Sequence, residues 1–342
     1  MKLRLLTTAC LAALCLCLPA AAAGEDPAGT APPAEVETLT AHCQAELFQA
    51  GSLTGDYTRP GPALLDDGVE GEMYALIYAA LEGEKDQVDL SGLGIRLETV
   101  LTPEGKPAID SNCEGARLLK QVYSRVVNDH PELFYVVNGY RYSASGYGDS
   151  FFLTTVTPQY DRELMDERED FDQRVETIVA MTDGMDALEK ALFFHDWLAT
   201  ENHYAPDSVR VPECNDKGEF LGLKYPNYCH SAYGALMKGE AVCQGYALAY
   251  KLLLDEAEVE CTAVTSDQLN HMWNAVSFDG NRWYYVDVTW DDPVEDKLGR
   301  CLHDNFLLSE DGLRATGHDS TDWTFNPDND NSVAYESGWA FN

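Results

Sequence analysis

The segment from Tyr246 to Leu254 constrains the fold more than any other part of this chain of 342 residues. Within the segment only Lys251 is charged, and the remaining residues are apolar or aromatic on nearly every side of a helix. A helix that is apolar all round is stable in water only when its surroundings bury it. The sequence therefore predicts a central helix that begins near Cys243 and has the rest of a domain packed around it.

Cys243, at the start of this helix, has two interpretations. A thiol in the first turn lies at the positive end of the helix dipole, which favours the thiolate, the form that attacks carbonyl carbons. A buried cysteine can equally be an inert core residue. Cys243 is therefore a candidate nucleophile that requires partners elsewhere in the chain.

A β-hairpin is predicted further along, over residues 271–290. An Asp-Gly dipeptide at 279–280 separates two runs rich in aromatic and β-branched residues, which is the pattern of two strands joined by a tight turn. A three-residue loop would pair Phe278 with Arg282. Position 271 then lies opposite position 289 and diagonal to position 287.

The alternation within the hairpin assigns two polar residues to one face. The even-numbered positions are largely apolar and are expected to face the core, which leaves His271 and Asp287 together on the other face. Diagonal neighbours in a sheet lie roughly 7–8 Å apart, close enough for an imidazole–carboxylate hydrogen bond. With Cys243 they would form a nucleophile, a general base and an acid that orients the base.

Three sequence elements resemble those of a known family. They are G-x-x-V-C-x-G-Y-A around Cys243, H-x-W-N at 271–274 and D-V-T-W-D-D-P at 287–293. In this order they resemble bacterial secreted transglutaminase-like domain proteins, within the transglutaminase-like and papain-like cysteine enzyme superfamily. The resemblance implies an α+β, papain-like core in which the nucleophile helix packs on an antiparallel sheet. It also implies a Cys243, His271 and Asp287 triad that needs no cofactor.

Two classes of function remain open at this stage. The first is a cysteine-dependent acyl hydrolase or acyl transferase that acts on amide bonds of proteins or cell-wall peptides through a thioester. The second is a catalytically silent, wall-associated binding or scaffold protein that keeps the fold. Tyr246, Trp273 and Asn274 are candidates for lining a substrate cleft, whereas Trp290 is expected to pack against the hairpin.

The first 23 residues predict export. Lys2 and Arg4 precede an apolar run from Leu5 to Leu18, and a stretch of alanines leads to a cleavage site before Gly24, as in a secretory signal peptide. We therefore expect a secreted or cell-surface protein without stable membrane insertion after cleavage. The formal charge of −35 disfavours binding to nucleic acid.

The seven cysteines that remain after cleavage could form up to three disulfides, with at least one free thiol. A zinc site built from Cys214, Cys229, His230 and Cys243 is disfavoured because paired C-x-x-C spacing is missing, and no metal is expected. The acidic residues Asp291, Asp292, Glu295 and Asp296 are interpreted as a solvated turn. His195 is expected to be a hydrogen-bonded core residue, and structural roles are expected for His303 and His318.

The predicted organisation has five parts. A signal peptide (1–23) and a linker (24–60), with a short helix near 39–50, precede a smaller N-terminal α+β region (61–160). The transglutaminase-like catalytic domain spans 161–325, and a tail covers 326–342. Helices are predicted over 69–81, 116–127, 161–181 and 187–202, and strands over 133–137, 140–143 and 151–157.

Overall fold

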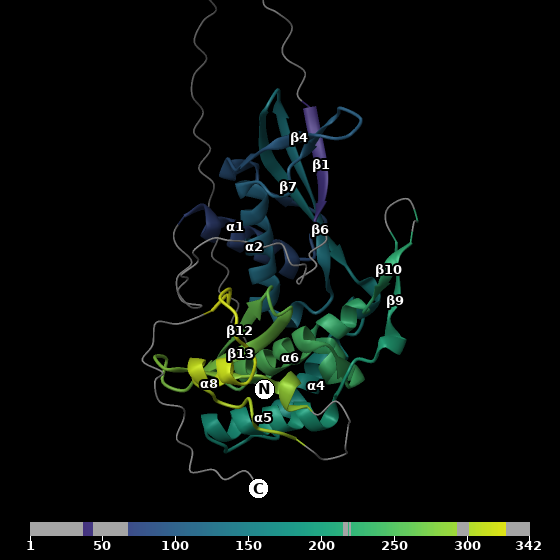
Figure 1. The fold of residues 1–342 in the computed structure, drawn as a ribbon. Helices are drawn as coiled ribbons and strands as arrows, with labels where there is room; N and C mark the ends of the chain where they lie inside the picture. Colours follow the sequence, from purple (N-terminus) through teal and green to yellow (C-terminus); the bar gives the residue numbers. More distant parts are fainter. Residues whose placement is uncertain (1–36, 44–67, 215–217, 219, 293–300, 326–342) are drawn as a thin grey trace, which may run out of the picture. The chain divides into compact units, whose positions relative to one another are not determined.

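The computed structural model describes residues 37–43, 68–214, 218, 220–292 and 301–325 (Figure 1). The predicted signal peptide and C-terminal tail lie outside these ranges. No helix in the described ranges is both long enough and apolar enough to cross a membrane.

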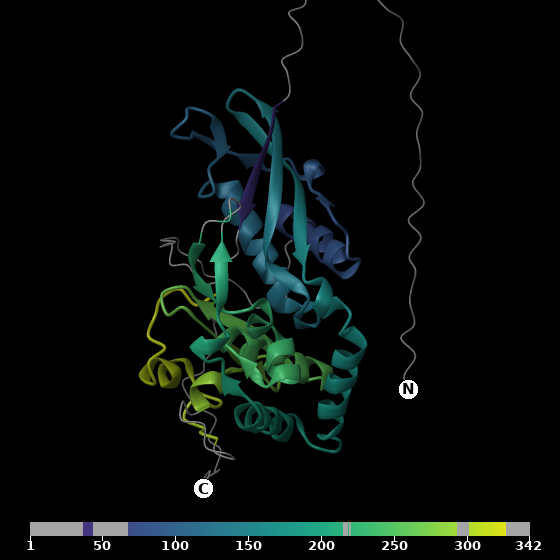
Figure 2. The same cartoon turned by 90° about the vertical axis from the view of Figure 1, so that its right-hand side faces the viewer.

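The N-terminal part of the described chain is an antiparallel sheet with two helices, α1 and α2. The sheet has the strand order β1-β6-β7-β2, and β3 also pairs with β7. Figure 2 shows the long β6–β7 hairpin with α2 beside it. The elements are β1 (Glu37–Cys43), α1 (Val69–Glu82), β2 (Val88–Asp89), η1 (Ser91–Leu93), β3 (Arg96–Leu97), β4 (Thr99–Leu101), β5 (Pro107–Ile109), α2 (Glu114–Asp129), η2 (Pro131–Leu133), β6 (Val136–Tyr147) and β7 (Ser150–Tyr160).

The C-terminal part contains helix α6 beside a second antiparallel sheet of order β12-β13-β14 (Figure 1). Its first elements are α3 (Arg162–Met165), α4 (Arg168–Ala180), α5 (Ala187–Glu201), β8 (His203–Tyr204), η3 (Asp207–Val209), β9 (Val211–Cys214), β10 (Phe220–Lys224), η4 (Asn227–His230) and η5 (Gly234–Lys238). They are followed by β11 (Glu240–Ala241), α6 (Cys243–Glu256), β12 (Glu260–Ser266), β13 (His271–Ser277), β14 (Trp283–Val286), α7 (Val288–Asp291) and α8 (Glu310–Ala315). The chain is therefore of mixed α+β class, with antiparallel sheets as expected.

Helix α6 has the buried position that its sequence predicts. It begins at Cys243, and every residue from there to Leu254 is buried, including Lys251. The Lys251 ammonium group pairs with Asp255 one turn later, which satisfies the one charge on the helix.

Strand β13 is buried on both of its faces. Met272 and Val276 on one face belong to the core that surrounds α6. Trp273 and Ala275 on the other face belong to a second cluster that includes Trp323. The main core also runs from α1 and α2 into α6, so buried contacts continue across residue 160, where the sequence suggested a boundary.

The hairpin prediction is confirmed in register and wrong in length. Ser277 pairs with Trp283 and Asn274 with Val286, as a loop at 279–281 requires. The second strand ends at Val286 rather than at 290, because Asp287 caps the short helix α7. Its Oδ1 accepts hydrogen bonds from the backbone N–H groups of Thr289 and Trp290.

Two other local predictions are wrong. Residues 37–43 form strand β1, which pairs with β6, where a linker with a short helix at 39–50 was expected. The strand predicted at 133–137 is replaced by the turn η2 and the start of β6. Among the cysteines whose side chains are described, six are free thiols: Cys43, Cys113, Cys229, Cys243, Cys261 and Cys301.

Candidate active site

The start of α6 is held in place by close backbone packing. Gly239 adopts a left-handed conformation (φ 66°) that ends η5, and the next residues form β11, which pairs in parallel with β8. A Cβ atom at Gly245 would lie 2.6 Å from the carbonyl oxygen of Cys229, so only glycine fits there without a shift of backbone. This packing fixes the position of Cys243 in the first turn of the helix.

The three residues predicted as a triad come together. His271 Nε2 lies 2.6 Å from Asp287 Oδ2, and the Cys243 thiol lies near enough to the His271 imidazole to raise its pKa. Because Asp287 occupies Nε2, the nitrogen left for Cys243 is Nδ1. The three residues are nearly excluded from water, with exposed fractions of 6% for Cys243, 5% for His271 and 1% for Asp287.

A fourth residue, His318, also binds the Asp287 carboxylate. Its Nε2 lies 2.8 Å from Asp287 Oδ2, and its Nδ1 lies 3.2 Å from Thr316 Oγ1. The ring is fully buried and packs against Trp290 at a centroid distance of 4.0 Å. The structural role expected for His318 is therefore specific: it donates to the acid of the triad and fixes its position.

The electrostatics of the pair are dominated by Asp287. Burial opposes a charged His271 imidazole, but the Asp287 carboxylate outweighs burial and raises the pKa of His271 to about 10. Burial also opposes the Asp287 charge, yet His271 and His318 hold the pKa of Asp287 well below its usual range. At neutral pH the structure thus favours an imidazolium beside the Cys243 thiol.

Tyr204 supplies a group that the sequence did not indicate. The Tyr204 hydroxyl lies close enough to the backbone N–H of Cys243 for that group to lower the pKa of the phenol, but burial outweighs this effect and raises it. The hydroxyl group is therefore protonated at neutral pH and can act as a donor. A backbone N–H and a hydroxyl that converge beside a nucleophile can together stabilise an oxyanion. The contact depends on the β8–β11 pairing, a two-residue ladder that no local pattern predicts.

The three residues predicted to line a cleft are buried instead. The Tyr246 hydroxyl donates to Asp292 Oδ2 at 2.5 Å, and the Asn274 amide donates to the carbonyl oxygen of Ala247 at 3.0 Å, which fastens β13 to α6. Trp273 packs between His271 and Trp323, and all three side chains are at most 1% exposed. These three side chains pack on the buried side of the triad.

Trp290 is an exposed aromatic residue beside the triad. It stacks on His271 at a centroid distance of 5.2 Å and keeps 40% of its surface exposed. The sequence assigned it to packing, and the structure shows packing on one face and exposure on the other.

The prediction of a solvated acidic turn is wrong for Asp291 and Asp292. Both are buried, and Asp291 is fully so. The Asp291 carboxylate accepts hydrogen bonds from the backbone and the side chain of Asn305 and from His195. Glu295 and Asp296 lie outside the described residues.

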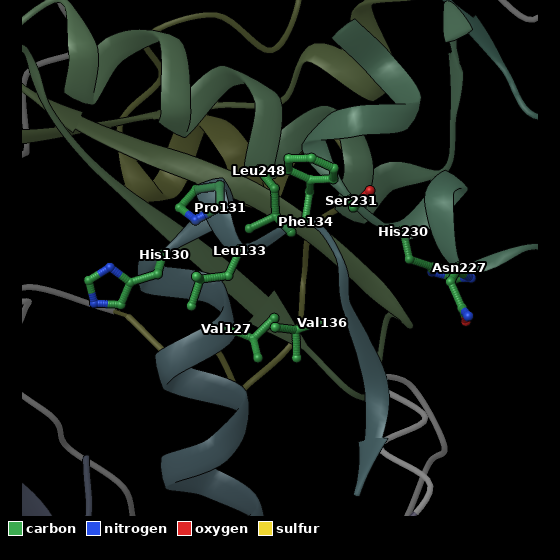
Figure 3. Close-up of a pocket in the computed structure, with 10 residues that line it drawn as sticks. All are labelled: Val127, His130, Pro131, Leu133, Phe134, Val136, Asn227, His230, Ser231 and Leu248. Carbon is green, nitrogen blue, oxygen red and sulfur yellow. The ribbon is translucent and has the colours of Figure 1, made fainter. Parts of the chain in front are cut away.

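A small pocket lies apart from the triad, between the end of α2, η2 and η4 (Figure 3). Its lining is mostly apolar and contains none of the triad residues: Val127, His130, Pro131, Leu133, Phe134, Val136, Asn227, His230, Ser231 and Leu248. His130 ends α2, and its Nε2 lies 3.0 Å from the Tyr74 hydroxyl.

Comparison with known proteins gives little beyond this geometry. No family model matches the chain, and no curated protein matches it. A solved structure described as "Crystal structure of a TGase" is similar over 43% of each chain, with 12% sequence identity and a TM-score of 0.27. The functional conclusion therefore rests on the site itself.

Proposed function

We propose that this chain is a secreted cysteine-dependent acyl hydrolase or acyl transferase with a transglutaminase-like core, acting on amide bonds of proteins or cell-wall peptides. The observation that carries the proposal is the chain of contacts from Cys243 to His271 to Asp287 at the start of a buried helix. A binding or scaffold protein has no use for a histidine held between a thiol and a carboxylate. The presence of His318 behind Asp287 adds to this, because it fixes the acid that orients the base.

The geometry supports a two-step mechanism. The Cys243 sulfur attacks the amide carbonyl carbon and forms a C–S bond, while charge develops on the carbonyl oxygen near the Cys243 N–H and the Tyr204 hydroxyl. The C–N bond then breaks, and His271 delivers its proton to the leaving amine. In the second step His271 takes a proton from water or from an acceptor amine. That nucleophile bonds to the thioester carbonyl carbon and the C–S bond breaks, which releases an acid or a new amide and leaves the Cys243 sulfur beside the protonated His271.

Substrate contacts are expected at the exposed side chains next to the triad. Tyr204 is 45% exposed and Trp290 is 40% exposed, whereas the residues behind the triad are closed to water. We therefore propose that the acyl group approaches between Tyr204 and Trp290. Hydrolysis is favoured over transfer because water is present at about 55 M, and transfer requires that the site exclude it.

The first experiment asks whether Cys243 forms an acyl-enzyme. The purified chain is incubated with p-nitrophenyl acetate, and the acetylated cysteine is located by mass spectrometry. Acetylation of Cys243 with release of nitrophenol is expected in the wild type and in Cys43→Ala, and it should be absent in Cys243→Ala. Adding a primary amine then shows whether the acyl group passes to the amine or to water.

A binding or scaffold protein would show no preferential acetylation of Cys243. If Cys243 is acetylated no faster than Cys43, and if His271→Ala does not change the rate, the enzyme proposal is wrong. Circular dichroism of each variant separates loss of chemistry from loss of folding.

A further inference from the structure

A second cluster of metal-ligating side chains lies outside the triad, between α5 and the segment that begins at residue 301. It consists of His195 and Asp196 on α5 with Cys301 and His303, and one ligand atom from each lies within 4.8 Å of the other three. Asp196 Oδ1 is 2.9 Å from His195 Nδ1 and 2.7 Å from His303 Nε2. Cys301 Sγ is 3.7 Å from His195 Nδ1 and 3.6 Å from Asp196 Oδ1.

These separations are close to the edges of a zinc tetrahedron. Zn–N and Zn–O bonds of about 2.1 Å and a Zn–S bond of about 2.3 Å place neighbouring ligand atoms about 3.4–3.6 Å apart. The two distances from Cys301 Sγ, 3.6 and 3.7 Å, lie at the upper end of this range or 0.1 Å above it. The two distances from Asp196 Oδ1 are those of direct hydrogen bonds and would lengthen by about 0.5–0.7 Å around an ion of this size.

The orientation of His195 is a second, independent indication of a metal ligand. The ring is fully buried, and its Nε2 lies 3.1 Å from Asp291 Oδ2, which leaves Nδ1 facing the cluster. Asp291 is itself held by the backbone N–H of Asn305 and by the Asn305 side chain. A histidine that binds a metal through one nitrogen usually donates its other N–H to a carboxylate held in this way.

The composition of the cluster selects zinc among the common ions. Two imidazoles and a thiolate suit zinc, whereas calcium and magnesium require a set of oxygen ligands. A Cys301 thiolate and an Asp196 carboxylate together carry two negative charges, which balance Zn²⁺. Four protein ligands leave no open position, so the site fits a structural ion rather than a catalytic one.

We propose that His195, Asp196, Cys301 and His303 bind a structural zinc ion. The ion ties the segment from residue 301 to α5. Through His195 and Asp291 it also holds the C-terminal end of α7, the helix whose N-cap is Asp287. The site differs from the zinc site considered from sequence, where no metal was expected.

The test measures zinc directly. The full chain is stripped of metal, and zinc affinity is measured by competition with a chromophoric chelator; Co²⁺ is then used as a spectroscopic probe. One zinc per chain is expected, and the cobalt form should show a thiolate charge-transfer band and the visible bands of a tetrahedral site. Cys301→Ser should lose the charge-transfer band, and Cys43→Ser should keep it. Asp291→Asn should weaken zinc binding about 10–100-fold.

A measurement on the wild type guards against variants that fail to fold. Zinc is expected to protect Cys301 from iodoacetamide and to leave the reactivity of Cys43 unchanged. If zinc leaves Cys301 unprotected, or if Cys301→Ser and Cys43→Ser bind zinc equally well, the proposal is wrong. Zinc binding that is lost in His318→Ala but kept in Cys301→Ser would place the ion at the triad and overturn it too. None of these readouts depends on acyl transfer, so failure here is distinguishable from failure of the proposed function.

Discussion

Replacing Asp287 by asparagine tests the electrostatic basis of the site. The Asp287 carboxylate accepts four hydrogen bonds, from His271 and His318 at Oδ2 and from two backbone N–H groups at Oδ1. The pKa of His271 rises from 6.5 to about 10 because this carboxylate outweighs the effect of burial. That rise corresponds to about 5 kcal/mol in favour of the charged imidazole.

Asp287→Asn keeps the size of the side chain and removes its charge. The amide oxygen can still accept from the backbone of α7, but only Cys243 then opposes the effect of burial on His271. We expect the pKa of His271 to fall from about 10 to below 6.5, so that the imidazole is neutral at pH 7. The acylation rate of Cys243 should fall with it, because the neighbouring imidazolium that favours the thiolate is lost.

The pKa of His271 can be followed by NMR of ring-labelled histidine from about pH 5 to 11. Asp86→Asn is the matched control, because the Asp86 side chain is 90% exposed and the charge change is the same. The reasoning is refuted if wild-type His271 titrates near 6.5. It is refuted equally if Asp287→Asn leaves the pKa near 10.

Four further outcomes are expected. Gly245→Ala should lower the free energy of unfolding by about 1–3 kcal/mol, because its Cβ would meet the Cys229 carbonyl oxygen. Denaturant titration measures this against Gly92→Ala, where a Cβ meets nothing within 4 Å. Equal free energies of unfolding for the two variants would contradict the prediction. His318→Ala should cost about 2–4 kcal/mol in the same assay, since it removes a buried hydrogen bond to Asp287, and a cost below about 0.5 kcal/mol would be evidence against that role. Tyr204→Phe should lower the acylation rate constant of Cys243 about 10²–10³-fold with unchanged folding, and an unchanged rate would remove Tyr204 from the oxyanion site. Because the pKa of His271 is raised on folding, its contribution to stability should be full below about pH 6.5 and lost as pH rises through about 10. A free energy of unfolding that depends on pH no more in the wild type than in Asp287→Asn would contradict the raised pKa of His271.

Local patterns in the sequence predicted the parts of the site that depend on neighbouring residues. The apolar run after Cys243 identifies a buried helix, because no other environment suits it. The turn at 279–280 fixes the register of β13 against β14, because a loop of defined length pairs defined residues. The register places His271 and Asp287 together, and the family resemblance added Cys243 to them.

Contacts between distant segments could not be predicted in this way. His318 reaches Asp287 across 31 residues, and Tyr204 reaches Cys243 through a two-residue parallel ladder. Residues 37–43 have the local sequence pattern of a linker or a helix. They form a strand because β6 is present to pair with them. In each case the deciding interaction lies outside the window in which propensity or periodicity can be read.

Helix α7 is the element on which both clusters depend. A helix of four residues is not stable on its own, so its position must come from contacts at its ends. At its N-terminus Asp287 is held by two buried imidazoles, and at its last residue Asp291 is held by His195 and Asn305. If the contacts at Asp291 loosened, the C-terminal end of α7 would be free to move. The N-terminal end of the same helix is capped by Asp287, the acid of the triad. The cluster around His195 therefore bears on the orientation of His271, although no residue of that cluster takes part in the proposed chemistry.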